Sequence, residues 1–517
     1  MRIQEPPTRL SPASCLIFLR DHWPEYAPLV VIGLLGFLLR LWTIGYGTNV
    51  DEGDYLMQGR ELLRGHWPYR DVHLNKPPLV SMLGFPFFLF WKVPILPARV
   101  FMILVGVSSL WAIYVLGKEL FDEPAGIFAA VGLALDPYSA IWAKYLHVST
   151  LTPALSLWSL AFLIHGLKRE KIPFVVLSGF FSSLCLLNKQ TGIFLLPLIG
   201  LCFLWFWPSQ KGRRMLLNYC LGFIPLPLIV FGIILALGAM EPFLYDLIWG
   251  NLAMSGFFHE TMLDRWNEFR AIEFLNPLWW RLAVLGIGFS VLKRVSGSVI
   301  ALIWLILEFG VNLFGLSHVW PHYVLAIMPP AYLLTGFGLS AVSHWVLRNR
   351  AAWAWNGWLP IAIALLCAVP FWPRSNWAYP NLTLDDERAL AAFFQRHCPS
   401  RYFLCFADSA FYIWTGKEVP PSIRGDRRVR IPPFMNTAGR KYLSLEDMKK
   451  TVQFWEILPM DFCVMYGKYY RQIFEERDPQ VAPVREFLER EFERTQVIST
   501  KPTYYAQIIG FQRKSNK

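Results

Sequence analysis

The chain has 517 residues, of which 55% are hydrophobic, 16% are aromatic and only 17% are charged. Soluble proteins contain about 25% charged residues, so this composition and the mean hydropathy of +0.36 exclude an ordinary soluble protein and predict a polytopic α-helical membrane protein. The net charge of +12 does not indicate a nucleic-acid partner, because many Lys and Arg residues stand in short clusters between apolar runs, as at 168–171 and 211–214.

The first apolar run, 27–46, is followed by a polar loop at 47–97 with a dense group of charges. Asp51 and Glu52 come within a few residues of the run, where ionisable residues are functional candidates unless they only end a helix and stay hydrated. Residues 54–65 predict a short amphipathic helix that ends at Gly65, and Lys76 is fixed by two following prolines. A carboxylate that accepts a proton and a cation that stabilises a departing phosphate suit a reaction at a lipid phosphate.

The apolar run at 77–91 is short and contains Pro86, which predicts a re-entrant or surface-lying helix, with a further membrane span as the alternative. A span needs about 20 mostly apolar residues. We expect about 11 transmembrane helices, at residues 27–46, 98–117, 124–141, 148–166, 172–188, 190–207, 215–238, 277–292, 298–316, 322–343 and 353–372.

Positive charge between these runs predicts their orientation. With the N-terminus inside, the cytoplasmic loops contain Lys118 and the clusters at 168–171, 211–214, 293–294 and 348–350, whereas the loops on the other side are poorer in Lys and Arg. This bias agrees with an odd number of spans. The loop at 47–97 and the C-terminal residues are therefore expected on the outer side of a plasma (inner) membrane.

From about residue 376 the composition becomes that of a soluble protein. Residues 384–397 and 444–457 have helical periodicity, and 401–407, 461–467 and 504–512 read as short strands. The chain is thus expected to have a transmembrane domain at 1–375 and a small extracytoplasmic α/β domain at 376–517. Because the latter shows no glycine-rich phosphate loop or catalytic signature, we expect it to be an accessory or acceptor-binding domain.

Three stretches together resemble a known superfamily: "DEGDY…G…PYRD…KPPL" at 51–79, "GFFSSLCLLNKQTG" at 179–192 and "PHYVLAIMPPAYLL" at 321–334. Their order and spacing are similar to those of the GT-C glycosyltransferases, above all the protein mannosyltransferase and aminoarabinose transferase group with its bacterial galacturonosyltransferase-like members. The resemblance covers about residues 27–345. It implies an integral-membrane, inverting transferase that takes a sugar from a polyprenyl-phosphate donor and passes it to a lipid, polysaccharide or protein acceptor.

The resemblance also implies roles for single residues. Asp51 matches the family's catalytic carboxylate, with Glu52 beside it, and Lys76 matches the basic residue that contacts the lipid phosphate. Lys189, between two apolar runs on the outer side, is a further candidate for that phosphate, with simple snorkelling to the interface as the alternative. The remaining candidates are Tyr323 for the donor phosphate and Tyr55, Tyr69, Asp71 and His322 for the acceptor or for positioning.

Two departures from the relatives concern a metal ion and the acid–base partner of the reaction. Asn75 stands where some relatives have a metal-binding carboxylate, and residues 147–155 offer only Ser149, Thr150 and Thr152 where some have an acidic residue. No cofactor or metal ligand is therefore predicted, and a divalent metal stays an unsupported alternative. We expect the phosphate to leave with the help of a lysine and without a metal ion. His322 is expected to pack at the interface rather than to bind metal.

Two other functions remain as alternatives. A transporter or flippase of lipid-linked sugars favours two related halves with broken helices and charges at mid-bilayer, but the sequence shows no internal repeat and its charges gather at one interface. A non-catalytic homologue is suggested by the two departures. Loss of Asp51 or Lys76 would have supported it, and both residues are present.

Overall fold

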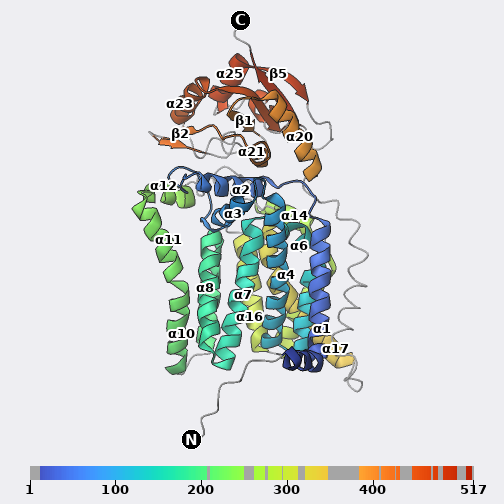
Figure 1. Cartoon of the computed structure of the whole chain (residues 1–517). Coiled ribbons are helices and arrows are strands. Elements are labelled where there is room, and N and C mark those ends of the chain that lie inside the picture. The colour runs from blue at the N-terminus through green and yellow to red at the C-terminus, as the bar shows by residue number, and fades with distance from the viewer. Residues whose placement is uncertain are drawn as a thin grey trace.

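The computed structural model describes residues 12–205, 210–249, 261–273, 277–293, 295–312, 321–346, 383–406, 409–424, 427–430, 445–466, 470–475, 481–497 and 508–514. The molecule has two parts: a bundle of helices, and a unit with a β-sheet that lies against one end of the bundle (Figure 1). The predicted span at 353–372 and the predicted domain boundary at 375–376 lie outside the described residues.

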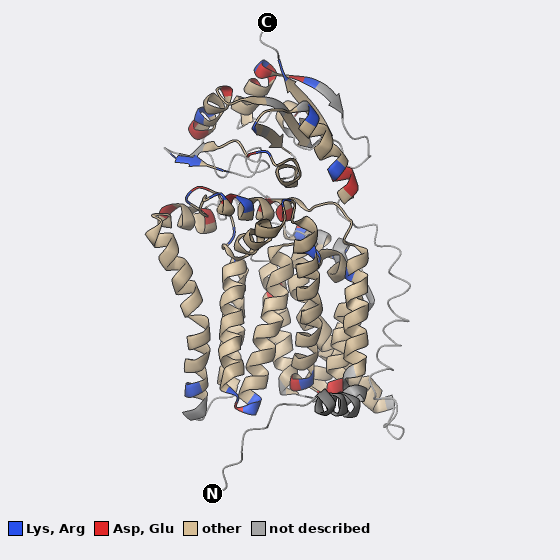
Figure 2. Cartoon of the chain, in the orientation of Figure 1, with Lys and Arg blue, Asp and Glu red and all other residues tan. Residues whose placement is uncertain are grey.

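The bundle contains α1 (Pro12–Trp42), α4 (Ile95–Leu120), α5 (Glu123–Leu135), α7 (Val148–Arg169), α8 (Ile172–Asn188), α9 (Leu195–Trp205), α10 (Gln210–Phe223), α11 (Pro225–Ala236), α15 (Pro277–Lys293), α16 (Ser296–Gly310) and α17 (Val324–Val346). Within the described ranges, four stretches are long and apolar enough to cross a membrane: 95–120, 148–169, 212–236 and 324–345. Shorter apolar helices accompany them, so the number of about 11 spans stays a prediction. Charged residues gather at the ends of the bundle helices and on the sheet-containing unit (Figure 2).

The span expected at 124–141 is not one helix. It is divided at Asp136 into α5 and the short helix α6 (Pro137–Trp142). The carboxylate of Asp136 accepts the backbone N–H of Ser139 at 2.6 Å and the hydroxyl of Tyr332, from α17, at 2.5 Å. Pro137 cannot donate a backbone hydrogen bond and suits the first position of a new helix. The guanidinium of Arg40, from α1, donates to the carbonyls of residues 133 and 134, so polar contacts from two other helices hold the break.

Two short helices, α2 (Val50–Leu63) and α3 (Leu79–Phe90), lie across the end of the bundle that faces the β-sheet (Figure 1). The side chain of Asn49 caps α2 by accepting the backbone N–H of Asp51 at 2.9 Å. The two helices cross closely, because a Cβ atom at Gly59 would lie 2.7 Å from the backbone of Gly84. Nearby stand α12 (Met240–Leu244), η2 (Tyr245–Trp249), α14 (Met262–Glu273), η1 (Gln190–Phe194) and η4 (Pro321–Tyr323).

The described residues from 383 onward, here called the C-terminal unit, form a four-stranded sheet of order β1-β4-β6-β5. Strand β1 (Tyr402–Phe406) runs parallel to β4 (Met460–Tyr466), and β6 (Ile508–Arg513) runs antiparallel to β4 and to β5 (Phe492–Val497). A hairpin of β2 (Ser422–Arg424) and β3 (Arg427–Val429) stands apart from this sheet. The helices are α20 (Leu384–His397), α21 (Ala410–Thr415), α23 (Leu445–Glu456), η6 (Arg471–Glu475) and α25 (Ala482–Glu491).

Helix α2 belongs to the hydrophobic cores on both of its sides. Tyr55 and Leu56 are buried in the core of the bundle, whereas the next residue, Met57, is buried in the core of the C-terminal unit with Phe394 and Phe406. Because successive helical residues point in different directions, one short helix can serve two cores. The segment that carries Asp51 is therefore fixed by both parts of the molecule.

Candidate active site

Asp51 lies in the first turn of α2 and faces His147, the residue that caps α7. Oδ2 of Asp51 lies 2.7 Å from Nε2 of His147. The backbone N–H of Ser149 donates to Nδ1 of His147 at 3.0 Å, so Nδ1 is an acceptor and the proton that Asp51 accepts is on Nε2. The side chain of Asp51 keeps 36% of its surface exposed, which leaves it accessible to a substrate.

Two ammonium groups act on this carboxylate. Burial alone would raise the pKa of Asp51, but the hydrogen bond with His147 and the charges of Lys76 and Lys189 outweigh it, so the pKa of Asp51 lies below its ordinary value. Burial lowers the pKa of Lys76, and Asp51 opposes that shift. Burial and the charge of Lys76 lower the pKa of Lys189 to about 7. One ionised carboxylate therefore faces two cations, one of which titrates near neutral pH.

Lys189 reaches the site from the end of α8 and is only 5% exposed. Its Nζ donates to the hydroxyl of Ser149 at 3.2 Å and lies 4.2 Å from the centre of the Tyr323 ring. A cation at that distance from an aromatic face is stabilised by the ring. Ser149 thus serves two site residues, since its backbone orients His147 and its hydroxyl binds Lys189.

Lys76 is held through its backbone. The hydroxyl of Tyr69 donates to the carbonyl of Lys76 at 2.9 Å, and the side chain of Gln190 donates to the carbonyl of Asn75 at 2.9 Å. Two prolines follow and restrict the chain further. Tyr69, a candidate for the acceptor or for positioning, is buried with its ring 5.0 Å from that of Phe243. Its contacts therefore support Lys76.

Glu52, the second predicted catalytic carboxylate, is buried in an ion pair with Arg99 of α4. Its two oxygens accept from Nε and Nη2 of Arg99 at 3.0 and 2.6 Å, and neither side chain is exposed. Consecutive residues of a helix point about 100° apart, so Asp51 and Glu52 face different partners. The other donors of Arg99 bind the carbonyls of Ile44, Tyr46 and Gly47. Glu52 thus helps to fix the chain before Asp51.

Aromatic rings surround the Asp51–His147 pair. The ring of His322 lies 4.6 Å from that of His147 and 4.8 Å from that of Tyr323, in edge-to-face arrangements. Tyr55, one turn after Asp51, has its ring 6.0 Å from that of His147. Of the predicted acceptor or positioning residues, Tyr55 and His322 are therefore brought to the pair.

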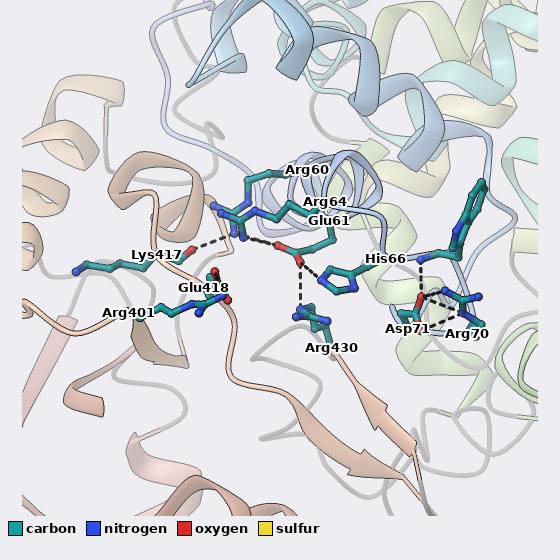
Figure 3. Close-up of polar contacts among 11 residues, drawn as sticks. Arg60, Glu61, Arg64, His66, Arg70, Asp71, Arg401, Lys417, Glu418 and Arg430 are labelled. Atoms are coloured by element: carbon teal, nitrogen blue, oxygen red, sulfur yellow. Dashed lines mark hydrogen bonds and ion pairs between the residues drawn. The ribbon is translucent and has the colours of Figure 1, made fainter. Parts of the chain in front are cut away.

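Asp71 is used within its own loop. Its Oδ2 accepts the backbone N–H of Trp67 at 2.8 Å and the guanidinium of Arg70 at 2.8 Å (Figure 3). Its backbone carbonyl accepts the N–H of Arg430 from the C-terminal unit at 2.9 Å. These contacts stabilise the turn between α2 and Lys76, and they give Asp71 a structural part in the loop.

Three side chains could hold a metal ion. Asp51, His147 and His322 each offer one ligand atom, and these atoms lie within 4.8 Å of one another. Two ligands of a tetrahedral zinc ion lie about 3.3 Å apart. The 2.7 Å between Oδ2 of Asp51 and Nε2 of His147 is instead the length of a hydrogen bond. As arranged, this pair shares a proton, and its side chains would have to separate before an ion could enter between them.

Sequence reasoning missed His147 and Arg99. Both are ionisable residues at the ends of apolar runs, and that position was the available signal. His147 is the first residue of 147–155, the stretch in which some relatives have an acidic residue. The contact of each residue with α2 joins positions 96 and 47 residues apart, which no local pattern reveals.

A family model described as dolichyl-phosphate-mannose-protein mannosyltransferase matches residues 75–244, a range that includes Lys76, His147 and Lys189. No curated protein matches the sequence. The structure is similar to that of ArnT from Cupriavidus metallidurans in the apo state, with a TM-score of 0.62 and 13% identity over 97% of this chain and 98% of that chain. The chain therefore has a fold similar to that of ArnT.

Two further solved structures are similar in fold. ArnT from Cupriavidus metallidurans bound to undecaprenyl phosphate has a TM-score of 0.58 and 13% identity over 98% of this chain and 99% of that chain. The Archaeoglobus fulgidus oligosaccharyltransferase tethered with an acceptor peptide has a TM-score of 0.55 and 13% identity over 96% of this chain and 75% of that chain. The likeness in fold extends along nearly the whole of this chain.

Proposed function

We propose that the protein is an inverting membrane glycosyltransferase that moves a sugar from a polyprenyl-phosphate donor to a hydroxyl group of a lipid, polysaccharide or protein acceptor. One observation carries the proposal: the accessible, ionised carboxylate of Asp51 lies beside a buried imidazole and in the field of two lysines. The undecaprenyl phosphate in one ArnT structure supports a lipid-phosphate donor for this fold.

Asp51 is the proposed general base. Its Oδ2 is occupied by the proton of His147, whereas Oδ1 accepts no hydrogen bond from the residues that the structure describes. Oδ1 takes the proton of the acceptor hydroxyl as its oxygen bonds to the anomeric carbon of the sugar. The bond between that carbon and the phosphate oxygen breaks on the opposite face, so the configuration at this carbon inverts.

Lys76 and Lys189 are proposed to bind the donor phosphate, with Tyr323 holding Lys189 in place. The phosphate leaves with the electron pair of the broken bond, so its negative charge increases during the reaction. Ammonium groups that are already in place stabilise this charge without reorganisation. The step as written uses only these side chains and routes no electron pair through a metal ion.

The site is proposed to face the extracytoplasmic side of the plasma membrane. At the opposite end of the bundle, α4 ends with Lys118 in its last turn and α7 ends with Lys168 and Arg169. Basic residues are visible at that end in Figure 2. Positive charge at cytoplasmic helix ends is the usual arrangement, so it supports this orientation.

The test supplies membranes that contain the protein with a panel of labelled polyprenyl-phosphate sugars and follows the label. The wild type should pass one of these sugars to an acceptor. Asp51→Asn keeps the size of the side chain but removes the proton acceptor, so it should bind the donor and transfer almost no sugar. Asp385→Asn, at a carboxylate that is 87% exposed on α20, is the matched control and should remain active.

The same experiment separates the alternatives. A flippase would change the side of the membrane on which the labelled lipid is found and leave the sugar on its lipid in both variants. Full sugar transfer by Asp51→Asn would remove the carboxylate base from the mechanism.

A further inference from the structure

The chain just before Asp51 is held from two directions. From the bundle, the guanidinium of Arg99 donates to the carbonyls of Ile44, Tyr46 and Gly47. From the C-terminal unit, the backbone N–H of Leu384 donates to the carbonyl of Gly45 at 3.0 Å. The N-terminal end of α20 is thus hydrogen-bonded directly to the segment that precedes α2.

The side chain of Glu387, on α20, extends this connection. Its Oε1 accepts the backbone N–H of Thr48 at 2.6 Å and the hydroxyl of Thr48 at 2.8 Å, and its Oε2 accepts the indole N–H of Trp414 at 3.1 Å. Glu387 is only 3% exposed. A buried carboxylate is costly unless it is hydrogen-bonded, so these contacts are specific and hard to replace with water.

Only two residues separate Thr48 from Asp51. The intervening Asn49 is the N-cap of α2, and its side chain accepts the backbone N–H of Asp51. Displacement of Thr48 therefore moves the cap and, with it, the first turn of the helix. Glu387 acts on the proposed base through this short path without touching a substrate.

A second contact lies one turn further along α2. The hydroxyl of Ser409 donates to Oδ1 of Asp54 at 2.5 Å, and both residues are buried. Asp54 follows Asp51 by three positions, so the two lie on the same side of the helix. The C-terminal unit thus binds both before and after Asp51.

The last turn of α2 is also bound to the C-terminal unit (Figure 3). Arg60 donates to the carbonyls of Tyr412 and Lys417 at 2.5 and 3.1 Å. Glu61, which is 1% exposed, pairs with Arg430 at 3.1 Å. Glu61 also pairs with Arg64 of its own helix at 3.0 Å, so Arg430 adds a contact from the C-terminal unit to a carboxylate that is already compensated. The helix is held along its whole length.

We propose that Glu387 and Ser409 are positioning residues of the transferase, through which the C-terminal unit sets the orientation of Asp51. The inference rests on the proposed function. It adds that the C-terminal unit takes part in catalysis by positioning the base. A general base works only in a narrow geometry, and a misplacement of about 1 Å costs on the order of 10²-fold in rate. Contacts that fix the turn carrying Asp51 should therefore act on turnover more than on donor binding, which depends on Lys76 and Lys189.

The test compares Glu387→Ala, Glu387→Gln and Ser409→Ala in the full-length protein with Glu446→Ala, a control at an exposed carboxylate on α23. Sugar transfer is measured as kcat and as KM for the donor, and hydrogen exchange is measured for peptides of α2 and of the sheet. Glu387→Ala and Ser409→Ala should lower kcat about tenfold, leave the donor KM within about twofold and speed exchange in α2 only. Glu387→Gln should recover part of the kcat, because its amide oxygen still accepts from Thr48 while its NH2 group can no longer accept from Trp414.

Unchanged kcat in both Glu387→Ala and Ser409→Ala would overturn the inference, and so would a rise in the donor KM while kcat is kept. A third such result is hydrogen exchange that becomes equally faster in α2 and in the sheet, together with a kcat that Glu387→Gln does not recover. The last would show that the contacts only stabilise the fold. If the wild type transferred no sugar, the proposed function would fail, while the exchange of α2 would still show whether these contacts hold the helix.

Discussion

Donor affinity should depend on the protonation state of Lys189. Burial and the charge of Lys76 lower the pKa of Lys189 to about 7, so it is about 90% protonated at pH 6 and about 10% protonated at pH 8. The donor phosphate is a diester whose single charge does not change over this range, and it binds the protonated ammonium. Above pH 7 binding has to take up a proton, so the affinity should fall about tenfold from pH 6 to pH 8.

The assay titrates the purified protein with a polyprenyl-phosphate sugar in detergent at several pH values. Lys189→Arg keeps a positive charge at every pH, so its donor affinity should hardly change between pH 6 and pH 8. Lys92→Arg, at an exposed position, is the control and should retain the slope of the wild type. An equal affinity of the wild type at pH 6 and pH 8 would refute the reasoning. A slope that persists in Lys189→Arg would assign the proton to another group, such as a histidine.

Four further outcomes are expected. Lys76→Ala should lower turnover on the order of 10²-fold, as the loss of other charge-stabilising donors does. Lys92→Ala is the control and should keep its turnover. Normal turnover of Lys76→Ala would remove Lys76 from the site. Arg99→Met should cost about 3–5 kcal/mol of unfolding free energy by leaving Glu52 buried without a partner, and adding Glu52→Gln should restore much of it in a thermal melt. Treatment with a chelator should leave sugar transfer unchanged, and a loss reversed by Zn²⁺ or Mn²⁺ would assign an ion to the histidine pair. A topology reporter after Lys517 should be read on the outer side, and a cytoplasmic signal would mean that the spans are miscounted.

The elements of this fold were largely accessible from local patterns. Apolar runs predicted most bundle helices, and the periodicity of residues 384–397 and 444–457 predicted two helices of the C-terminal unit. The division at Asp136 was not predicted, although Asp136 followed by Pro137 is a local signal for the start of a new helix; the contact with the hydroxyl group of Tyr332, almost 200 residues away, carried no such signal. The mean hydropathy of residues 124–141 stays high across this break, so it predicts one helix.

The candidate site was accessible only in part for the same reason. The carboxylates and the lysine of the loop at 47–97 stand in one short motif, so Asp51 and Lys76 could be chosen from the sequence. Their adjacency could not show that Asp51 faces an accessible space while Glu52 is buried against Arg99. That distinction depends on which helix lies on each side of α2.

The division of α5 and α6 at Asp136 also constrains how the protein is made. The hydroxyl of Tyr332 that binds Asp136 is synthesised long after α5 has emerged from the ribosome. Until α17 inserts, Asp136 has to be accommodated near a membrane without this donor, and α6 lacks one of the contacts that fix its start. Because α6 leads directly to His147, the partner of Asp51 reaches its final place only when α17 docks. A nascent chain that ends just before residue 332 would already contain Asp51, His147, Lys189 and Tyr323, and still no assembled site.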